Sequence, residues 1–372
     1  GALEESLAQA KLRWTPTEAT EFNAVLSWNE LDAPGLYEQE FLPINRAVYD
    51  ARYRDMFNGG RAARPYEMIN DAPKRTREQE RMAGLSMRHD ASAFAVDAAL
   101  SWRSLDGRSF GTDLDLTALP AAAGGDFKET QATTAEVRLS SVDGAPLRWV
   151  IGVSQYRDRD QQVLATLVGP GTLDGYAPAP PQRNRAQDRA LFGQVTVALS
   201  PSLDLTGGLR WERAERRKQQ EAGVLDLGFL GQFGFPAEDL RDTYEELLPK
   251  LTLGWTASPT AFLYASSGKG WIPGGFNLQA TSASLAGGRD YSRYGAETLW
   301  SHEIGGKWQV LDGRGLLSAA LFWIDADHWQ EYNVLTDASG RALSTNLITS
   351  DATLRSRGGE VEFTWRASDA WD

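Results

Sequence analysis

The sequence predicts an all-β fold, and within that class a transmembrane antiparallel β-barrel. Three observations support this prediction. Apolar and polar residues alternate over stretch after stretch, which is the period of a two-faced strand. Short turn-like joints alternate with long polar connections along the whole chain. The 372 residues also include 13 tryptophans, several times the usual number in a soluble chain, and a high number of glycines, 36.

The strands are predicted from their period of two. In the stretch 189–200, Leu191, Val195 and Val197 share one face, and Gln194 and Thr196 lie on the other. The same alternation runs through the stretches 22–28, 94–102, 149–153, 203–213, 251–255, 304–310 and 361–365. Seven tryptophans fall on the apolar faces of these strands: Trp14, Trp28, Trp102, Trp211, Trp255, Trp308 and Trp365. That placement is typical of the headgroup zone of a membrane.

The connections fall into two classes. Short joints rich in Pro, Asp, Gly and Ser are Thr15–Thr20, Asp90–Ala93, Asp143–Pro146, Ser200–Ser202, Ala257–Thr260 and Leu311–Gly315. Long polar connections are predicted at 31–75, 107–128, 158–187, 214–243, 271–295 and 331–353. The strict alternation gives about thirteen strands in hairpins, with turns at one end and long extracellular loops at the other. Compact soluble domains rarely contain connections this long.

Composition excludes several classes of protein. There is no cysteine, and the three histidines are scattered, so no metal site is expected. A net charge of −12 disfavours nucleic acid as a partner. Leu251–Gly268 is free of charge, but Pro259 lies inside it, so it fails as a spanning helix. No nucleophile elbow, metal box or phosphate loop is present, so neither an enzyme nor a cofactor is expected.

Two other classes of protein remain open on pattern alone. A soluble propeller or carbohydrate-binding β-protein would also show many alternating strands, although no repeat of 40–50 residues is found. A passive outer-membrane porin would share the barrel and its long loops.

A series of stretches, in chain order, carries a family resemblance. The most specific is LPKLTLGWTASPTAFLYASSGKGWIPGGFN at Leu248–Asn277, followed by YGAETLWSHEIGGKW from Tyr294, ALFWIDADHWQ ending at Gln330, and RGGEVEF from Arg357. Earlier stretches are AEVRLSS from Ala135 and LFGQVTVALSPSLDLTGGLRWE from Leu191. Together they resemble the barrel of TonB-dependent outer-membrane receptors, which import iron–siderophore complexes, cobalamin and some sugars. The sequence departs from the family pattern at Ala296, Gly306 and Gly359.

The resemblance implies a location in the outer membrane of a Gram-negative bacterium, in contact with lipid and lipopolysaccharide. The family barrel has 22 strands, so residues 1–372 are expected to be an internal part of a single barrel, about 13 of 22 strands, without the plug domain. It further implies import of a scarce nutrient, with a ferric siderophore favoured. Energy would come from the TonB–ExbB–ExbD complex, acting through the missing plug.

The polar faces of the strands are then expected to line the lumen: Asp97, Arg103, Glu136, Arg138, Arg210, Glu212, Lys250, Glu303, Lys307, Glu360, Glu362 and Arg366. Any one of them could simply hydrate the wall or pair across strands. Ligand selectivity is expected in the long loops, above all in 31–75, where aromatic residues and arginines interleave. The ligand-binding candidates are Tyr37, Tyr49, Arg52, Tyr53 and Arg54, a set suited to an anionic, ring-bearing ligand. The alternative is that these aromatics pack the loop onto itself and the arginines meet lipopolysaccharide or loop carboxylates.

Overall fold

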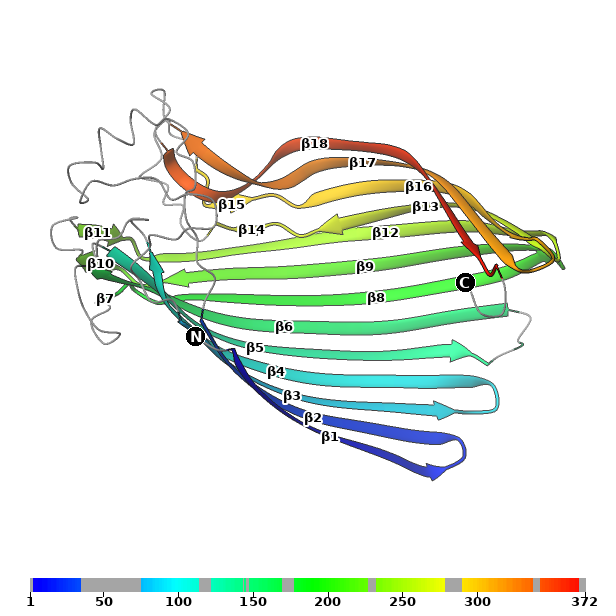
Figure 1. The fold of residues 1–372 in the computed structure, drawn as a ribbon, viewed down its shortest axis with the longest axis horizontal. Helices are drawn as coiled ribbons and strands as arrows, with labels where there is room; N and C mark the ends of the chain where they lie inside the picture. The colour runs from blue at the N-terminus through cyan, green and yellow to red at the C-terminus, as the bar shows by residue number, and fades with distance from the viewer. Residues whose placement is uncertain are drawn as a thin grey trace.

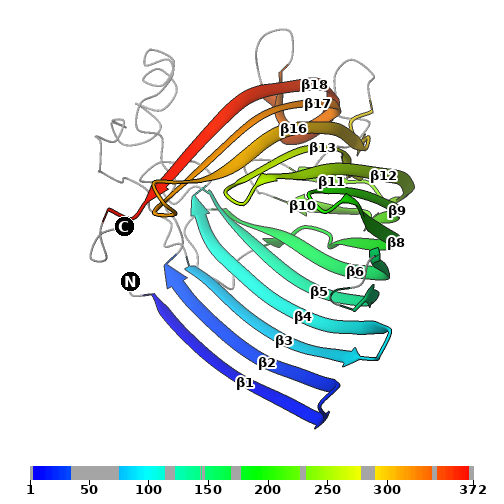
Figure 2. The same ribbon diagram turned by 90° about the vertical axis from the view of Figure 1, so that its right-hand side faces the viewer.

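One continuous, curved antiparallel sheet makes up almost all of the described protein (Figures 1 and 2). The structure, a computed structural model, describes residues 3–34, 75–113, 122–142, 144, 147–168, 177–226, 232–277, 290–336 and 342–367. The sheet has 14 strands, of which thirteen follow one another along a single path and β7 pairs with β6 off that path. The number of strands predicted from the alternation is therefore confirmed. Within the described residues, no helix is long and apolar enough to cross a membrane.

The path runs through β1 (Glu4–Thr17), β2 (Thr20–Pro34), β3 (Arg75–Asp90), β4 (Phe94–Asp113), β5 (Ala122–Ser141), β6 (Leu147–Val168), β8 (Gln182–Ser200), β9 (Leu203–Gln220), β12 (Glu238–Ser258), β13 (Ala261–Ile272), β16 (Glu297–Val310), β17 (Gly315–Thr336) and β18 (Ala342–Trp365). Strand β7 is Ala177–Pro178. Two small sheets pair β10 (Gly223–Asp226) with β11 (Gln232–Phe235) and β14 (Gly275–Phe276) with β15 (Arg293–Tyr294). Strands β1 and β18 stand at the two ends of the path.

Five of the six short joints are described, and they lie where the sequence predicts them, at one end of the sheet (Figure 1). Of the sixth, Asp143–Pro146, only Gly144 is among the described residues. The joint between β16 and β17 shows how the chain reverses so tightly. Leu311, Asp312 and Gly313 have φ values of 54°, 54° and 83°, in the left-handed region that such turns use. Hereafter this end is called the turn side, and the opposite end the loop side.

The strands continue further toward the loop side than the sequence indicates. Gly107 pairs with Lys128, Asp158 with Ala186, and Ala214 with Tyr244, so pairing enters three ranges that were predicted as connections. Strands β17 and β18 likewise pair well into 331–353, and β14 and β15 form inside 271–295. The predicted connections at 107–128, 158–187, 214–243 and 331–353 are therefore too long. Beyond the membrane both faces of a strand are polar, so the alternation stops although the backbone ladder continues.

The two faces of the sheet have opposite chemistry. On β12, Leu251, Leu253 and Trp255 are 54%, 40% and 46% exposed on one face, while Lys250 lies on the other. Residues on the same face of other strands are exposed in the same way, such as Leu26 on β2, Leu100 on β4, Ile151 on β6, Leu209 on β9, Ile304 on β16 and Val361 on β18. The buried apolar residues of the described chain are mostly alanine. Apolar side chains therefore face outward, as they do in a wall that touches lipid.

Tryptophan forms two girdles on the outward face. The turn-side girdle consists of Trp14, Trp149, Trp255, Trp308 and Trp365, and the loop-side girdle of Trp28, Trp102, Trp211, Trp300 and Trp323. Trp255 pairs in register with Leu203, eight residues along β9 from Trp211. At about 3.4 Å per residue the girdles are about 27 Å apart along the tilted strands, comparable with an apolar band of about 25 Å.

Candidate functional site: the concave wall

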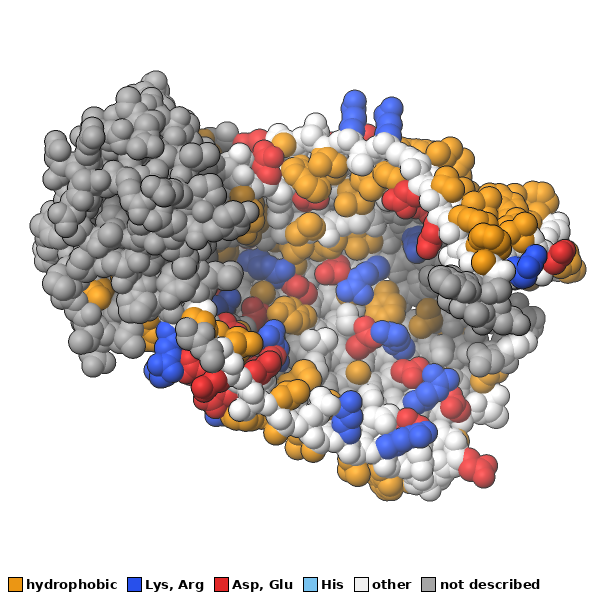
Figure 3. Space-filling model, viewed as in Figure 1, with side chains coloured by type: hydrophobic (Ala, Val, Ile, Leu, Met, Phe, Trp, Pro, Cys, Tyr) orange, Lys and Arg blue, Asp and Glu red, His pale blue; other side chains and the backbone are white. Residues whose placement is uncertain are grey.

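The inward face of the sheet is a hollow in which acidic and basic side chains gather together (Figure 3). The residues predicted to line a lumen alternate with the outward apolar ones and therefore lie on this face. Glu360 and Glu362, for example, flank Val361, which is 76% exposed on the opposite face. Arg366 follows the end of β18.

Most of the inward charges that the structure describes meet a charge of opposite sign. Arg210 donates to Glu212 at 2.7 Å, and Arg148 donates to Asp204 at 2.9 Å. Further inward pairs are Arg138 with Glu136, Arg103 with Glu80, and Arg88 with Asp97. The sequence analysis left open whether the inward charges pair across strands, and several of them do.

A buried lysine anchors the loop side of this wall. Lys218 on β9 is 1% exposed, and its Nζ lies 2.9 Å from a carboxylate oxygen of Glu238 at the start of β12. The same ammonium donates to the main-chain oxygen of Asn277 at 2.8 Å. Because a buried ammonium is stable only when paired, this contact holds the segment after β14 against the wall.

Asn277 joins three separate parts of the chain. Its amide nitrogen donates to the main-chain oxygens of Tyr291 and Ile348, each at 2.8 Å, and its oxygen accepts the Ile348 amide at 2.7 Å. One side chain therefore ties the end of β14, the approach to β15 and strand β18 together. We call Lys218, Glu238, Asn277, Glu297 and Gln330 the loop-side polar cluster.

Glu297 and Gln330 complete this cluster. Glu297 is 2% exposed and accepts the main-chain amide of Gln330 at 2.9 Å. The Gln330 side chain donates to the main-chain oxygens of Pro273 at 3.2 Å and Gly295 at 3.0 Å. These bonds fix the path of the chain before β14 and after β15, so both segments fold inward over the concave wall.

A glycine is required where these segments meet. A Cβ on Gly274 would lie 2.4 Å from the main-chain oxygen of Tyr294 and 2.6 Å from the ring of Tyr244. Burial raises the pKa of the Tyr294 hydroxyl above its usual value. Nearby, hydrogen bonds from the Ser292 hydroxyl and amide lower the pKa of the Asp290 carboxyl. Tyr294 is therefore neutral and Asp290 ionised at neutral pH.

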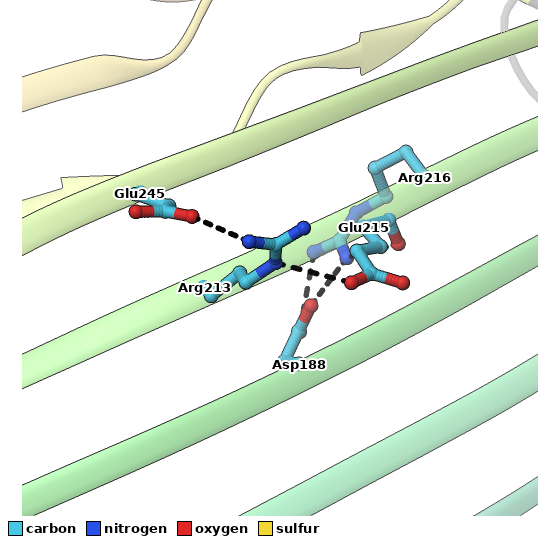
Figure 4. Close-up of polar contacts among 5 residues, drawn as sticks. All are labelled: Asp188, Arg213, Glu215, Arg216 and Glu245. Carbon is cyan, nitrogen blue, oxygen red and sulfur yellow. Dashed lines mark hydrogen bonds and ion pairs between the residues drawn. The ribbon is translucent and has the colours of Figure 1, made fainter.

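Polar contacts also join β8, β9 and β12 (Figure 4). Arg216 pairs with Asp188 on the inward side. Arg213 faces outward with Trp211, two residues away, and meets Glu215 at 3.1 Å and Glu245 at 2.8 Å. At the same level along the strands, both faces of the sheet are therefore charged.

The ligand-binding candidates Tyr37, Tyr49, Arg52, Tyr53 and Arg54 all lie outside the described residues. Within the described ranges, no group of three or more His, Asp or Glu side chains is placed to hold a metal ion.

Sequence reasoning missed the loop-side polar cluster as a structural unit. Asn277, Glu297 and Gln330 lie within the stretches that resemble the family, and that resemblance is the available signal. Lys218 and Glu238 carried no signal, because a single charge on a polar stretch of strand is ordinary.

Solved structures with the same fold include uptake receptors and a transporter. The ferric yersiniabactin uptake receptor from Yersinia pestis has a TM-score of 0.74 at 17% identity, and the match covers 99% of this chain and 50% of that one. A siderophore receptor from Acinetobacter baumannii gives 0.69 at 11% identity, covering 99% and 55%, and a copper transporter gives 0.68 at 13%, covering 99% and 51%. The chain thus spans about half the length of the structures that it matches.

Similarity at this level of identity shows the fold alone. The family is shown by a separate match, because the sequence model of the TonB dependent receptor-like β-barrel matches residues 17–372, nearly the whole chain. The chain therefore belongs to the TonB-dependent receptor β-barrel family of the Gram-negative outer membrane.

Proposed function

We propose that this chain is part of the wall of an outer-membrane receptor that imports a ferric siderophore, energised through the TonB–ExbB–ExbD complex acting on a plug domain. Membership in a receptor family bears out the expectation that the chain is not an enzyme. It also excludes the soluble propeller and carbohydrate-binding alternatives, since the family is a membrane barrel.

The observation that carries the proposal is the family match over residues 17–372. The cargoes named for the matched structures include ferric yersiniabactin, ferric citrate and copper, and a metal is common to these three. Siderophore receptors recur among these structures. This supports a metal complex as the class of ligand and favours a ferric siderophore within it.

The concave wall supports a receptor over a passive porin. Many inward charges are neutralised in pairs, such as Arg210 with Glu212, and the segments around β14 and β15 are tied over the wall by Asn277. A porin depends on an open aqueous lumen, whereas a plugged receptor needs an inner surface that can pack against another domain.

Ligand recognition is assigned to the first long loop. Tyr37, Tyr49 and Tyr53 offer aromatic faces, and Arg52 and Arg54 offer guanidinium groups that can bind a carboxylate or catecholate oxygen with two hydrogen bonds. A ferric siderophore presents both rings and negative charge, which matches this set.

Uptake of radioactive iron tests the function directly. A strain that lacks the gene is complemented with the full-length protein and supplied with purified ferric siderophores under iron limitation. We expect uptake of at least one ferric siderophore, and its loss when TonB is deleted. Uptake that persists without TonB would indicate a passive porin and contradict the proposal.

The loop assignment has its own test. Replacing Arg52 and Arg54 by Gln should weaken ligand binding by about a hundredfold or more, because hydrogen bonds to charged groups contribute about 1.5–3 kcal/mol each. Arg61→Gln with Arg64→Gln is the matched control, since it removes the same charge from the same loop. Equal losses in the two variants would show a general charge effect and not a binding site.

A further inference from the structure

Four arginines stand side by side across four adjacent strands. Arg159 on β6 pairs in register with Arg185 on β8, Arg185 with Arg217 on β9, and Arg217 with Arg241 on β12. We call these four residues the arginine row. Like charges directly opposite each other in a sheet repel and destabilise the pairing, so such a row calls for an explanation.

The arginine row is on the outward face. Six residues away on each of the same strands lie Val153, Leu191, Trp211 and Leu247, which are themselves in register and exposed to the outside. An even number of residues keeps a side chain on the same face of a strand. The row therefore points away from the lumen.

Along the strands, the row lies beyond the apolar band of the wall, on the loop side. Trp211 belongs to the loop-side girdle, and Arg217 is six residues, or about 20 Å along a tilted strand, further toward the long connections. Arg189 and Arg213 fill the first row beyond the girdle and Arg157 lies in the second. The zone from the girdle to the arginine row is where the head groups of the outer leaflet lie.

Neutralisation of the row by the protein is incomplete. Asp239 meets both Arg217 at 2.7 Å and Arg241 at 3.2 Å. Arg159 and Arg185 are exposed and, among the described residues, their side chains form no ion pair. Arg159, Arg185, Arg217 and Arg241 also contribute to the lining of one depression of about 400 Å³. This concentration of positive charge occurs in a chain with a net charge of −12.

We propose that the arginine row binds phosphate groups of the phosphorylated glycolipid in the outer leaflet. Guanidinium groups bind phosphate oxygens with two parallel hydrogen bonds, and a phosphate between two arginines removes their mutual repulsion. A soluble ligand destined for import would be bound from the lumen, whereas these side chains face the membrane. The row thus fastens this sector of the wall to the lipid around it.

The test uses the full-length protein purified in a nonionic detergent, with two probes presented in mixed micelles: bisphosphorylated lipid A and its dephosphorylated form. We expect the protein to bind the phosphorylated lipid more tightly, with an affinity that falls as salt is added. Arg159→Ser with Arg185→Ser should weaken that binding by about twenty-five-fold, because each arginine near an anionic surface contributes about a factor of five. Neither substitution leaves a carboxylate without its partner among the described residues.

Arg314→Ser with Arg366→Ser is the matched control. Both arginines are exposed on the turn side, next to β17 and β18, at the end of the sheet away from the row. We expect this control to change the affinity by less than about twofold. Heat-dependent migration in detergent gels shows whether each variant is folded. If the double row variant does not fold, the comparison of the two lipids on the unaltered protein and its dependence on salt still decide the question.

Three results would overturn the proposal. One is equal affinity for the phosphorylated and dephosphorylated lipids. Another is an equal loss of affinity in the row variant and the control. The third is binding of inorganic phosphate as tight as binding of the lipid, which would assign the row to a soluble anion.

Discussion

The turn-side and loop-side halves of the same strands share one pattern of backbone hydrogen bonds but carry different outward side chains. On β9, Leu205 lies in the turn-side half and Arg217 in the loop-side half, and both point outward. The antiparallel register passes through both positions without a break. Backbone pairing therefore sets the shape of the wall, while the surrounding medium, lipid or water, sets the side chains that the wall can carry.

The loop-side half depends on buried polar contacts, and removing one partner should have the largest effect. Lys218→Met leaves Glu238 as an uncompensated, mostly buried carboxylate. We expect a loss of about 3–5 kcal/mol in the free energy of unfolding, measured by urea titration in detergent.

The double variant Lys218→Met with Glu238→Gln serves as the control, because it removes both charges. It should recover much of the lost stability. A loss below about 1 kcal/mol for the single variant would show that the contact with Glu238 is not needed for the loop-side half.

The turn-side half should instead reject charge on its outward face. Leu251→Arg places a guanidinium between the two girdles, where an arginine costs about 2–4 kcal/mol near the membrane midplane. Thr243→Arg, on the same face of the same strand but beyond the loop-side girdle, should cost no more than about 1 kcal/mol. Urea titration of both variants in lipid bilayers gives the two values, and equal costs would remove the distinction between the halves.

Asn277 connects three segments, so its loss should loosen the loop-side half locally. Asn277→Ala removes the bonds to Tyr291 and Ile348 and should cost about 1–3 kcal/mol. Hydrogen exchange at the Ile348 amide should then accelerate, because its acceptor is gone. Asn333→Ala removes a bond to Thr349 on the same pair of strands and should leave exchange at Ile348 unchanged.

The exposed ion pairs on the outward face should contribute least to the stability of the wall. Arg213 contacts Glu215 and Glu245, yet all three side chains are at least 40% exposed (Figure 4). Arg213→Ser should therefore change the free energy of unfolding by no more than about 1 kcal/mol. A larger loss, measured by the same urea titration, would show that these contacts act as a network.

Much of the sheet could be predicted from the sequence, because lipid imposes a strict pattern on the turn-side half. Leu191, Val195 and Val197 alternate with polar residues, and the short joints are rich in turn-forming residues. The extension of β6 and β8 beyond Asp158 could not be predicted, since Arg157, Asp158 and Arg159 are polar on both faces. A strand whose two faces are both polar shows no alternation of apolar and polar residues, so its sequence does not indicate that its backbone is paired.

The loop-side polar cluster could not be predicted from the sequence either, because its members are far apart in the chain. Lys218 and Asn277 are 59 residues apart in the chain. No local sequence pattern indicates that the Lys218 ammonium will donate to the main-chain oxygen of Asn277. The arginine row has a similar origin, since Arg159 and Arg241 are 82 positions apart and only the register of four strands aligns them.

The sequence by itself determined the strand period, the turns, the outward tryptophans and the inward charges, because each follows from one residue and its near neighbours meeting lipid or water. Tertiary structure alone decided how far the strands continue, how Lys218 and Asn277 fasten the inward segments, and which arginines stand in one row. Those features depend on cross-strand register, which is fixed by hydrogen bonds between residues far apart in the chain.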